Sequence, residues 1–156
     1  MSYSPPPAEP VTSGSPFRRA PLGWAQRVAM VGAGTVLASL LITAACLTPS
    51  VKGMGTHQQL GLPPCTIVQW YGFRCPSCGM TTSWAHLTKG RVITAFRSNA
   101  GGALLGLAAM ALGPWLIVSG ARGKWTWTEP REMTVMVVGV SIIVVTLIDW
   151  TLRLWN

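Results

Sequence analysis

The chain has 156 residues, of which 49% are hydrophobic and 10% are charged, against roughly 25% charged in an average soluble domain, so the composition indicates a membrane protein. Its twelve Lys and Arg outnumber four acids, and no carboxylate lies between Pro10 and Thr128. That gap excludes paired-carboxylate catalysis and an oxygen-ligand site for calcium or magnesium from the middle of the chain.

The N-terminal part of the sequence predicts a tail followed by a first membrane span. Residues 1–23 are rich in Pro, Ser and Gly and hold few apolar side chains, which is typical of a disordered tail. An uncharged apolar run from Val28 to Thr48 follows, so we predict a transmembrane helix over residues 24–48. Trp24 and Arg27 stand at its start, as interface anchors do.

The first apolar run has two other interpretations, a cleaved signal sequence and a lipoprotein signal with a lipidated Cys46. Thr43, three residues before Cys46, stands where such lipidation sites usually carry an aliphatic residue. The run is also longer than a typical signal core. We therefore expect a retained helix, in which Cys46 is a small apolar residue.

An uncharged run predicts a second transmembrane helix over residues 101–121, and residues 122–132 form a short wet connection. Residues 133–156 predict a third transmembrane helix with an interfacial end: the run is uncharged as far as Ile148, Asp149 follows near the helix end, and Trp150, Arg153 and Trp155 are typical of the interface. Gly102 and Gly106 form a GxxxG pair, which favours close packing against another helix. The predicted fold class is an all-α membrane protein. It has three transmembrane helices and a short Cys-rich interfacial helical segment between the first and the second.

Residues 49–100 form the only long segment outside the predicted spans. The segment begins as a Gly- and Pro-rich loop, and His57 within it is assigned no role. The amphipathic residues 91–99 predict an interfacial helix that leads into the second span.

A second short helix is predicted over residues 80–90 of this segment. Thr81 or Thr82 is expected to cap its start, and Gly90 is expected to end it. Trp84 is expected to anchor the helix at the membrane interface.

Three cysteines and a histidine are concentrated around this short helix. Cys65 is followed after nine residues by Cys75, after two more by Cys78, and after seven more by His86. Cys75 and Cys78 form a CxxC turn, half of a common zinc arrangement, which Cys65 and His86 can complete. Thiolate and imidazole ligands suit zinc, copper or iron, so one prediction is a metal site made of these four residues, with zinc as the candidate cofactor.

Two alternatives to the metal site stay open. Cys65 can form a disulfide with Cys75 or Cys78, which would staple a segment too small to carry its own core if the loop faces an oxidising compartment. Cys75 and Cys78 can instead be a catalytic redox pair, because a CxxC turn at a helix start lowers a thiol pKa. The βαβ context expected of such enzymes is absent from the sequence pattern.

The stretch from Pro64 to Gly102 resembles the signature of a family of small bacterial membrane proteins that share a domain of unknown function. Its pattern is Cys, about ten residues, Cys-Pro-x-Cys-Gly-hydrophobic-Thr, a short helix, Gly, and Ala-Phe-x-x-Asn. The matching residues are Cys65, Cys75, Pro76, Cys78, Gly79, Thr81, Gly90, Ala95, Phe96 and Asn99. Thr82 and Ala100 depart from it, where many members have Arg and Pro. The resemblance implies the membrane architecture and the cysteine cluster as the site, and it implies no reaction.

Charge gives an expectation for orientation. Three spans place the N-terminal tail and residues 122–132 on one side of the membrane, and the cysteine segment and the C-terminus on the other. With Arg27 counted on the first side and Arg153 on the second, each side has six Lys and Arg. The count does not decide, but the first helix often dominates, and three arginines precede or begin it. We expect a multi-pass protein of the bacterial inner membrane with a cytoplasmic N-terminus and an external cysteine loop.

The predicted function is a non-catalytic membrane protein whose cluster binds a metal or holds a structural disulfide in support of a partner. The alternative is a membrane thiol–disulfide oxidoreductase that uses Cys75 and Cys78. The basic residues are scattered beside apolar runs, so the lipid bilayer is the expected partner and nucleic acid is not. A membrane-protein partner or a second copy of the chain is also expected.

Overall fold

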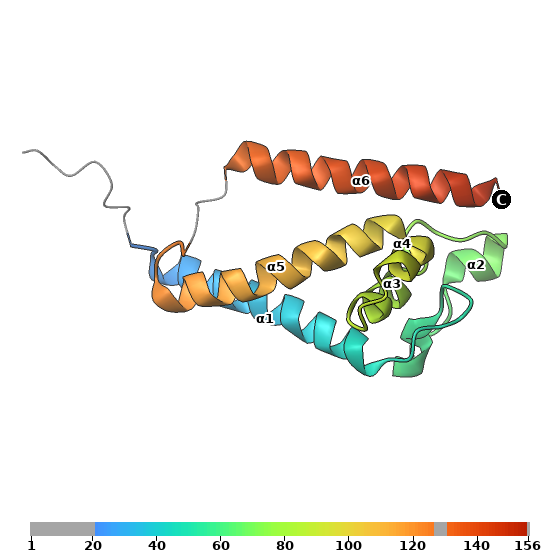
Figure 1. Cartoon of the computed structure of the whole chain (residues 1–156), viewed down its shortest axis with the longest axis horizontal. Helices are drawn as coiled ribbons and strands as arrows, with labels where there is room; N and C mark the ends of the chain where they lie inside the picture. The colour runs from blue at the N-terminus through green and yellow to red at the C-terminus, as the bar shows by residue number, and fades with distance from the viewer. Residues whose placement is uncertain (1–20, 127–130, 156) are drawn as a thin grey trace, which may run out of the picture.

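The protein, seen in a computed structural model that describes residues 21–126 and 131–155, is helical, with no strand in those residues (Figure 1). Its long helices are α1 (Trp24–Cys46), α5 (Ala100–Arg122) and α6 (Glu132–Leu154), each of 23 residues. At 1.5 Å per residue, such a helix exceeds the roughly 30 Å hydrocarbon core of a bilayer. The predicted fold class is confirmed, with three helices long and apolar enough to cross a membrane. Most of the predicted tail lies outside the described residues.

Four short helices separate α1 from α5 in the sequence. They are η1 (Thr56–Leu60), α2 (Thr66–Tyr71), α3 (Met80–Leu87) and α4 (Val92–Ser98). Figure 1 shows all four at one end of the molecule, together with the end of α1, the start of α5 and the C-terminal end of α6. Helix α3 packs against both α1 and α5. The cysteine segment and the C-terminal end of α6 therefore share one end of the structure.

Helix α3 carries the core of this end of the molecule. The Trp84 side chain is buried and packs with Ala44 of α1 and Ala109 of α5. Its indole Nε1 donates a hydrogen bond of 2.8 Å to the Gly102 carbonyl. The expectation that Trp84 is an interface anchor is therefore wrong, because the ring fills the space between two long helices.

The two glycines of the GxxxG pair contact α3. A Cβ atom on Gly106 would lie 2.7 Å from Leu87 Cδ1 and 3.0 Å from Trp84 Cδ1. A Cβ atom on Gly102 would lie 3.1 Å from the Met80 Cα. The expected close-packing face exists, and its partner is a short helix rather than another long one.

Helices α1 and α5 approach each other through small residues, as membrane helices commonly do. A Cβ atom on Gly34 would lie 2.8 Å from the Gly113 carbonyl oxygen and 2.7 Å from Ile117 Cγ1. Further along the same interface, Arg27 Nε donates a 3.0 Å hydrogen bond to the carbonyl of Gly120, in the last turn of α5. The Arg27 contact therefore joins α1 and α5 at the end of the helix pair that lies away from the cysteines.

We expect Gly34→Ala to destabilise the protein by about 1–3 kcal/mol, because the added methyl group meets backbone that cannot easily move aside. Gly32 lies on the same helix with nothing within 4 Å of the position a Cβ would take, so Gly32→Ala is the matched control. There, the better helix propensity of alanine should leave stability unchanged or raise it by up to about 1 kcal/mol. Thermal unfolding midpoints in detergent test this, and equal midpoints for both variants would contradict the packing described.

Candidate metal centre

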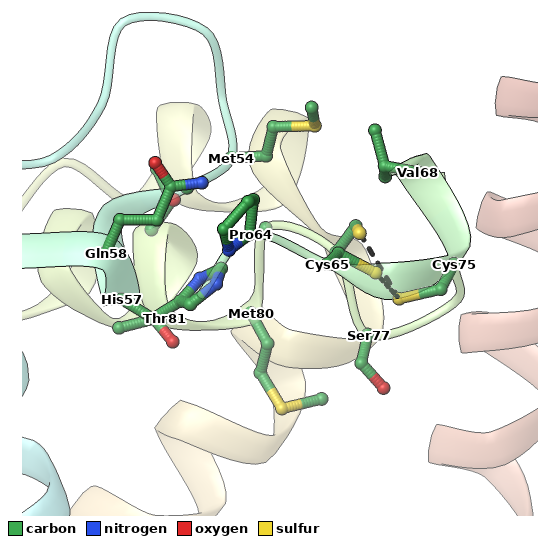
Figure 2. A pocket seen from close by; sticks show the side chains of 14 residues that line it. Met54, His57, Gln58, Pro64, Cys65, Val68, Cys75, Ser77, Met80 and Thr81 are labelled. Carbon is green, nitrogen blue, oxygen red and sulfur yellow. Dashed lines mark hydrogen bonds between the residues drawn. The ribbon is translucent and has the colours of Figure 1, made fainter. Parts of the chain in front are cut away.

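Three sulfur atoms meet where the start of α2 and the turn before α3 come together. The Cys65 thiol donates to Cys75 Sγ at 3.6 Å, and the Cys75 thiol donates to Cys78 Sγ at 3.2 Å (Figure 2). All three sulfurs lie within 4.8 Å of one another. Thiolates around a tetrahedral zinc ion, with Zn–S bonds of about 2.3 Å, stand about 3.8 Å apart. The three sulfurs are therefore close enough together to bind one metal ion.

The same distances show that the cysteines are free thiols. A disulfide requires sulfurs about 2.05 Å apart, and the Cys75 and Cys78 sulfurs are 3.2 Å apart. Cys65 and Cys46 are unbridged as well, and Cys46 is the last residue of α1, outside the cluster. The structure thus brings together the three cysteines predicted to act jointly, and the disulfide that was the alternative for Cys65 is not formed.

The CxxC turn is held by hydrogen bonds to its backbone. The Cys78 amide donates to the Cys75 carbonyl at 3.0 Å, which closes the turn. The side-chain amide of the fully buried Asn99 donates to the Pro76 carbonyl at 2.9 Å and to the Cys78 carbonyl at 3.1 Å. Asn99 Oδ1 accepts a 2.6 Å hydrogen bond from the Gly102 amide and so caps α5. One side chain therefore links the cysteine turn to the start of a long helix.

Gly79 follows the turn with φ of +92°, a conformation that favours glycine. The expected caps, Thr81 and Thr82, do not stand before the helix, because α3 begins at Met80 directly after Gly79. Thr82 is buried instead, and its hydroxyl lies 2.7 Å from the Thr56 hydroxyl. The cap prediction is wrong because a left-handed glycine leads the chain from the cysteine turn straight into the helix.

The C-terminal end of α6 contacts the segment that enters the turn. Trp150 Nε1 donates a 2.6 Å hydrogen bond to the carbonyl of Arg74, immediately before Cys75. The indole of α6 thereby holds the backbone immediately before Cys75, the first cysteine of the CxxC turn.

An ion pair in the same part of α6 contacts the chain that leaves α4. Arg153 pairs with Asp149 one turn earlier, and its guanidinium donates to the Ser98 carbonyl at 2.7 Å. Asp149 Oδ2 accepts a 3.1 Å hydrogen bond from the amide of Ala100, the first residue of α5. The two charged residues therefore form hydrogen bonds with the backbone groups on both sides of Asn99, the Ser98 carbonyl and the Ala100 amide. These contacts attach α6 to the segment that holds the cysteine turn.

The thiols have different environments. Cys65 stands at the start of α2, where a hydrogen bond from the Val68 amide lowers its pKa. Burial raises the pKa of Cys78 to about 12. A metal ion at the cluster would offset the cost of burying the Cys78 thiolate, because coordination to a metal ion deprotonates a thiol outright.

The predicted fourth member of the site, His86, is not brought to the sulfurs. It lies outside the group of ligand atoms that are within 4.8 Å of one another. Because α3 begins at Met80, His86 lies about 9 Å further along the helix axis. Its pKa is lowered by burial and by the nearby charges of Arg91 and Lys89. Its Nδ1 has no hydrogen-bond partner in the described part of the chain.

A cavity of about 250 Å³ borders the sulfurs (Figure 2). All three clustered cysteines line it, together with His57, to which the sequence pattern assigns no role. Among the described residues that line the cavity there is no carboxylate. Spacing could not have selected His57, because only the fold shows that η1 returns to the cysteine turn.

A comparison with known families covers this region. Residues 65–113 match DUF2752, a family described as a protein of unknown function. The match includes all three sulfurs and Asn99, while η1 and α6 lie outside it. Neither the curated proteins nor the solved structures provide a match to this chain.

The arrangement permits two kinds of chemistry. Three thiolates with no carboxylate beside them can hold a borderline or soft metal ion such as zinc. The approach of Cys75 and Cys78 can instead support disulfide formation, which would need the two sulfurs to move about 1 Å closer. The hydrogen bonds from Asn99 and from the Cys78 amide to the backbone of the turn serve both uses, since they position the cysteines through their carbonyl groups.

Proposed function

We propose that the DUF2752-like segment of this membrane protein is a structural metal centre, in which Cys65, Cys75 and Cys78 bind zinc. The observation that carries the proposal is the mutual approach of the three sulfurs within 4.8 Å. Zinc would contribute folding free energy by joining the start of α2 to the turn before α3. The ion would thereby stiffen the segment that lies at one end of the three long helices.

The proposal includes an orientation and a role. The N-terminus is cytoplasmic and the metal centre is external, in the inner membrane of a bacterium. The arginines that precede or begin α1 support this orientation. A bound ion would protect the thiolates from oxidation on that side. The stiffened segment would support a membrane-protein partner or a second copy of the chain, and the exposed apolar side chains of α6 are available to contact it.

Metal content tests the proposal directly. We expect protein purified in detergent to carry one zinc per chain. Each of Cys65→Ser, Cys75→Ser and Cys78→Ser should lose the zinc and show a lower thermal unfolding midpoint, because the thiolates act together on one ion. Cys46→Ser is the matched control, since Cys46 lies outside the cluster, and it should keep both zinc and stability. Purified protein without metal, or metal retained in all three cluster variants, would contradict the proposal.

A second candidate function is thiol–disulfide exchange, which the 3.2 Å separation of the Cys75 and Cys78 sulfurs favours. In this reaction the two thiols lose two electrons and two protons and form a disulfide, while a substrate disulfide is reduced to two thiols. The chain would then be isolated without zinc, and its oxidised form would have two alkylatable cysteines. Cys75→Ser would abolish exchange and leave the unfolding midpoint nearly unchanged.

A further inference from the structure

We infer that His57 is the fourth ligand of this metal centre and that it binds through Nδ1, giving a Cys₃His site. The inference rests on the proposed function, because it completes the same three-thiolate cluster. Structural zinc sites are almost always four-coordinate, so three sulfurs leave one position to fill. His57 belongs to η1, a separate element that precedes Cys65 in the chain.

His57 shares the cavity of about 250 Å³ with all three sulfurs. Figure 2 shows the imidazole and the sulfur atoms on either side of Pro64, which also lines the cavity. The ring and the cluster therefore border the same space. His86, the only other histidine in the sequence, does not line this cavity.

The hydrogen bond of the imidazole fits ligation through Nδ1. His57 Nε2 lies 3.2 Å from the Pro63 carbonyl oxygen. A carbonyl only accepts hydrogen bonds, so Nε2 carries the proton and donates it, which leaves the lone pair on Nδ1 free in the neutral ring. A metal-bound histidine almost always donates its other ring N–H to a carbonyl, carboxylate or water in this way.

The η1 helix is tied to the element that follows the cysteines. The Thr56 hydroxyl, next to His57, lies 2.7 Å from the Thr82 hydroxyl, and both side chains are buried. The Thr56 Oγ1 also accepts a 3.0 Å hydrogen bond from the Ser50 amide. These contacts hold the backbone at His57 beside the first turn of α3, which directly follows the cysteine turn.

Other donors that line the cavity fit the fourth position less well. Met54 and Met80 offer thioether sulfurs, which are not among the usual zinc ligands. Ser77 and Thr81 offer hydroxyls, which are not among the usual zinc ligands. The imidazole is therefore the one side chain in the cavity wall whose chemistry matches a zinc site that already holds three thiolates.

Ligation requires the ring to move toward the sulfurs. The His57 nitrogens are outside the group of atoms within 4.8 Å of one another. The side chain is only partly buried, and its hydrogen bond is to the nearby Pro63, two residues before Cys65. Ligation would need a rotation of the side chain together with a shift of the loop between η1 and Cys65.

The test uses full-length protein in detergent, with zinc itself as the probe. Zinc affinity is measured by chelator competition, and ¹⁵N spectra of histidine-labelled protein follow both imidazoles. We expect zinc to shift the Nδ1 signal of one histidine, and His57→Gln to lower zinc affinity at least about 10-fold. Glutamine keeps a donor for the Pro63 carbonyl and removes the imidazole lone pair. His57→Cys should restore the affinity as a Cys₄ site.

His86→Gln is the matched control and should leave both the zinc affinity and the shifted signal unchanged. Wild-type zinc affinity in His57→Gln, with no imidazole signal shifted by zinc, would overturn the inference and leave the three-cysteine site standing. A zinc-dependent signal that disappears in His86→Gln would overturn it in favour of the other histidine. A wild-type protein that binds no zinc would overturn the proposed function together with the inference.

Discussion

Gly79→Ala should be among the most damaging single-methyl substitutions in this chain. Gly79 has φ of +92°, and a side chain in the left-handed region costs about 1–2 kcal/mol. A Cβ atom there would also lie 2.5 Å from the Ser98 carbonyl oxygen and 2.6 Å from the Gly53 carbonyl oxygen. Both obstacles are backbone, so the turn must open. We expect a total loss above about 3 kcal/mol, measured as a fall of roughly 6–12 °C in the unfolding midpoint.

Gly90→Ala separates the two causes of this loss. Gly90 has a similar φ of +73°, but nothing lies within 4 Å of the position its Cβ would take. Its substitution should therefore cost only the conformational part, about 1–2 kcal/mol. If Gly79→Ala and Gly90→Ala lowered the midpoint equally, the close approach of Gly53 and Ser98 to the cysteine turn would be refuted. Zinc retention by Gly79→Ala at full affinity would show that the turn tolerates opening.

The long helices could be predicted from the sequence because their signal is local. An uncharged apolar run of the right length is sufficient to indicate a membrane span, whatever surrounds it. The GxxxG pair at Gly102 and Gly106 is also recognisable as a packing face. The partner of this face cannot be recognised in the same way. The pattern indicates that a helix comes close but gives no information on which helix it is. The neighbour is α3, whose Trp84 and Leu87 contact Gly106.

The cysteine cluster could be predicted in part. Thiols are few and chemically distinctive, so Cys65, Cys75 and Cys78 stand out by type and spacing. The histidine is harder, because spacing within one segment favours His86, whereas helix geometry carries that residue away from the turn. His57 comes near the sulfurs only through the return of η1 to α3, a contact between buried threonines that no local pattern encodes.

The roles of α6 in the site also lie beyond the sequence pattern. Asp149 is recognisable as a charge near a helix end, and Trp150 and Arg153 as features of an interfacial ending. In the structure, these side chains bind backbone groups of the cysteine segment and of the start of α5. Such contacts join residues 49 to 76 positions apart in the chain, so they depend on the packing of whole helices.

Asn99→Ala should destabilise the protein by about 3–5 kcal/mol and reduce zinc affinity. The substitution removes the side-chain donor to the Pro76 carbonyl and leaves the Cys78 carbonyl with only a long 3.5 Å hydrogen bond from Arg153. It also removes the cap on the Gly102 amide. Each buried group that loses its partner costs about 1–3 kcal/mol, and a lost helix cap costs about 1 kcal/mol. Thermal unfolding in detergent and chelator competition for zinc measure the two effects.

The neighbouring Ser98→Ala supplies the control for this prediction. Ser98 is also buried, but its hydroxyl donates to the Thr94 carbonyl one helical turn earlier, within the same short helix. Its loss should change stability by less than about 1 kcal/mol and leave zinc affinity intact. If Asn99→Ala were as mild as Ser98→Ala, the turn would hold its shape without Asn99. The link from α5 to the cysteines would then rest on the α6 contacts, and Arg153→Ala should show the larger loss.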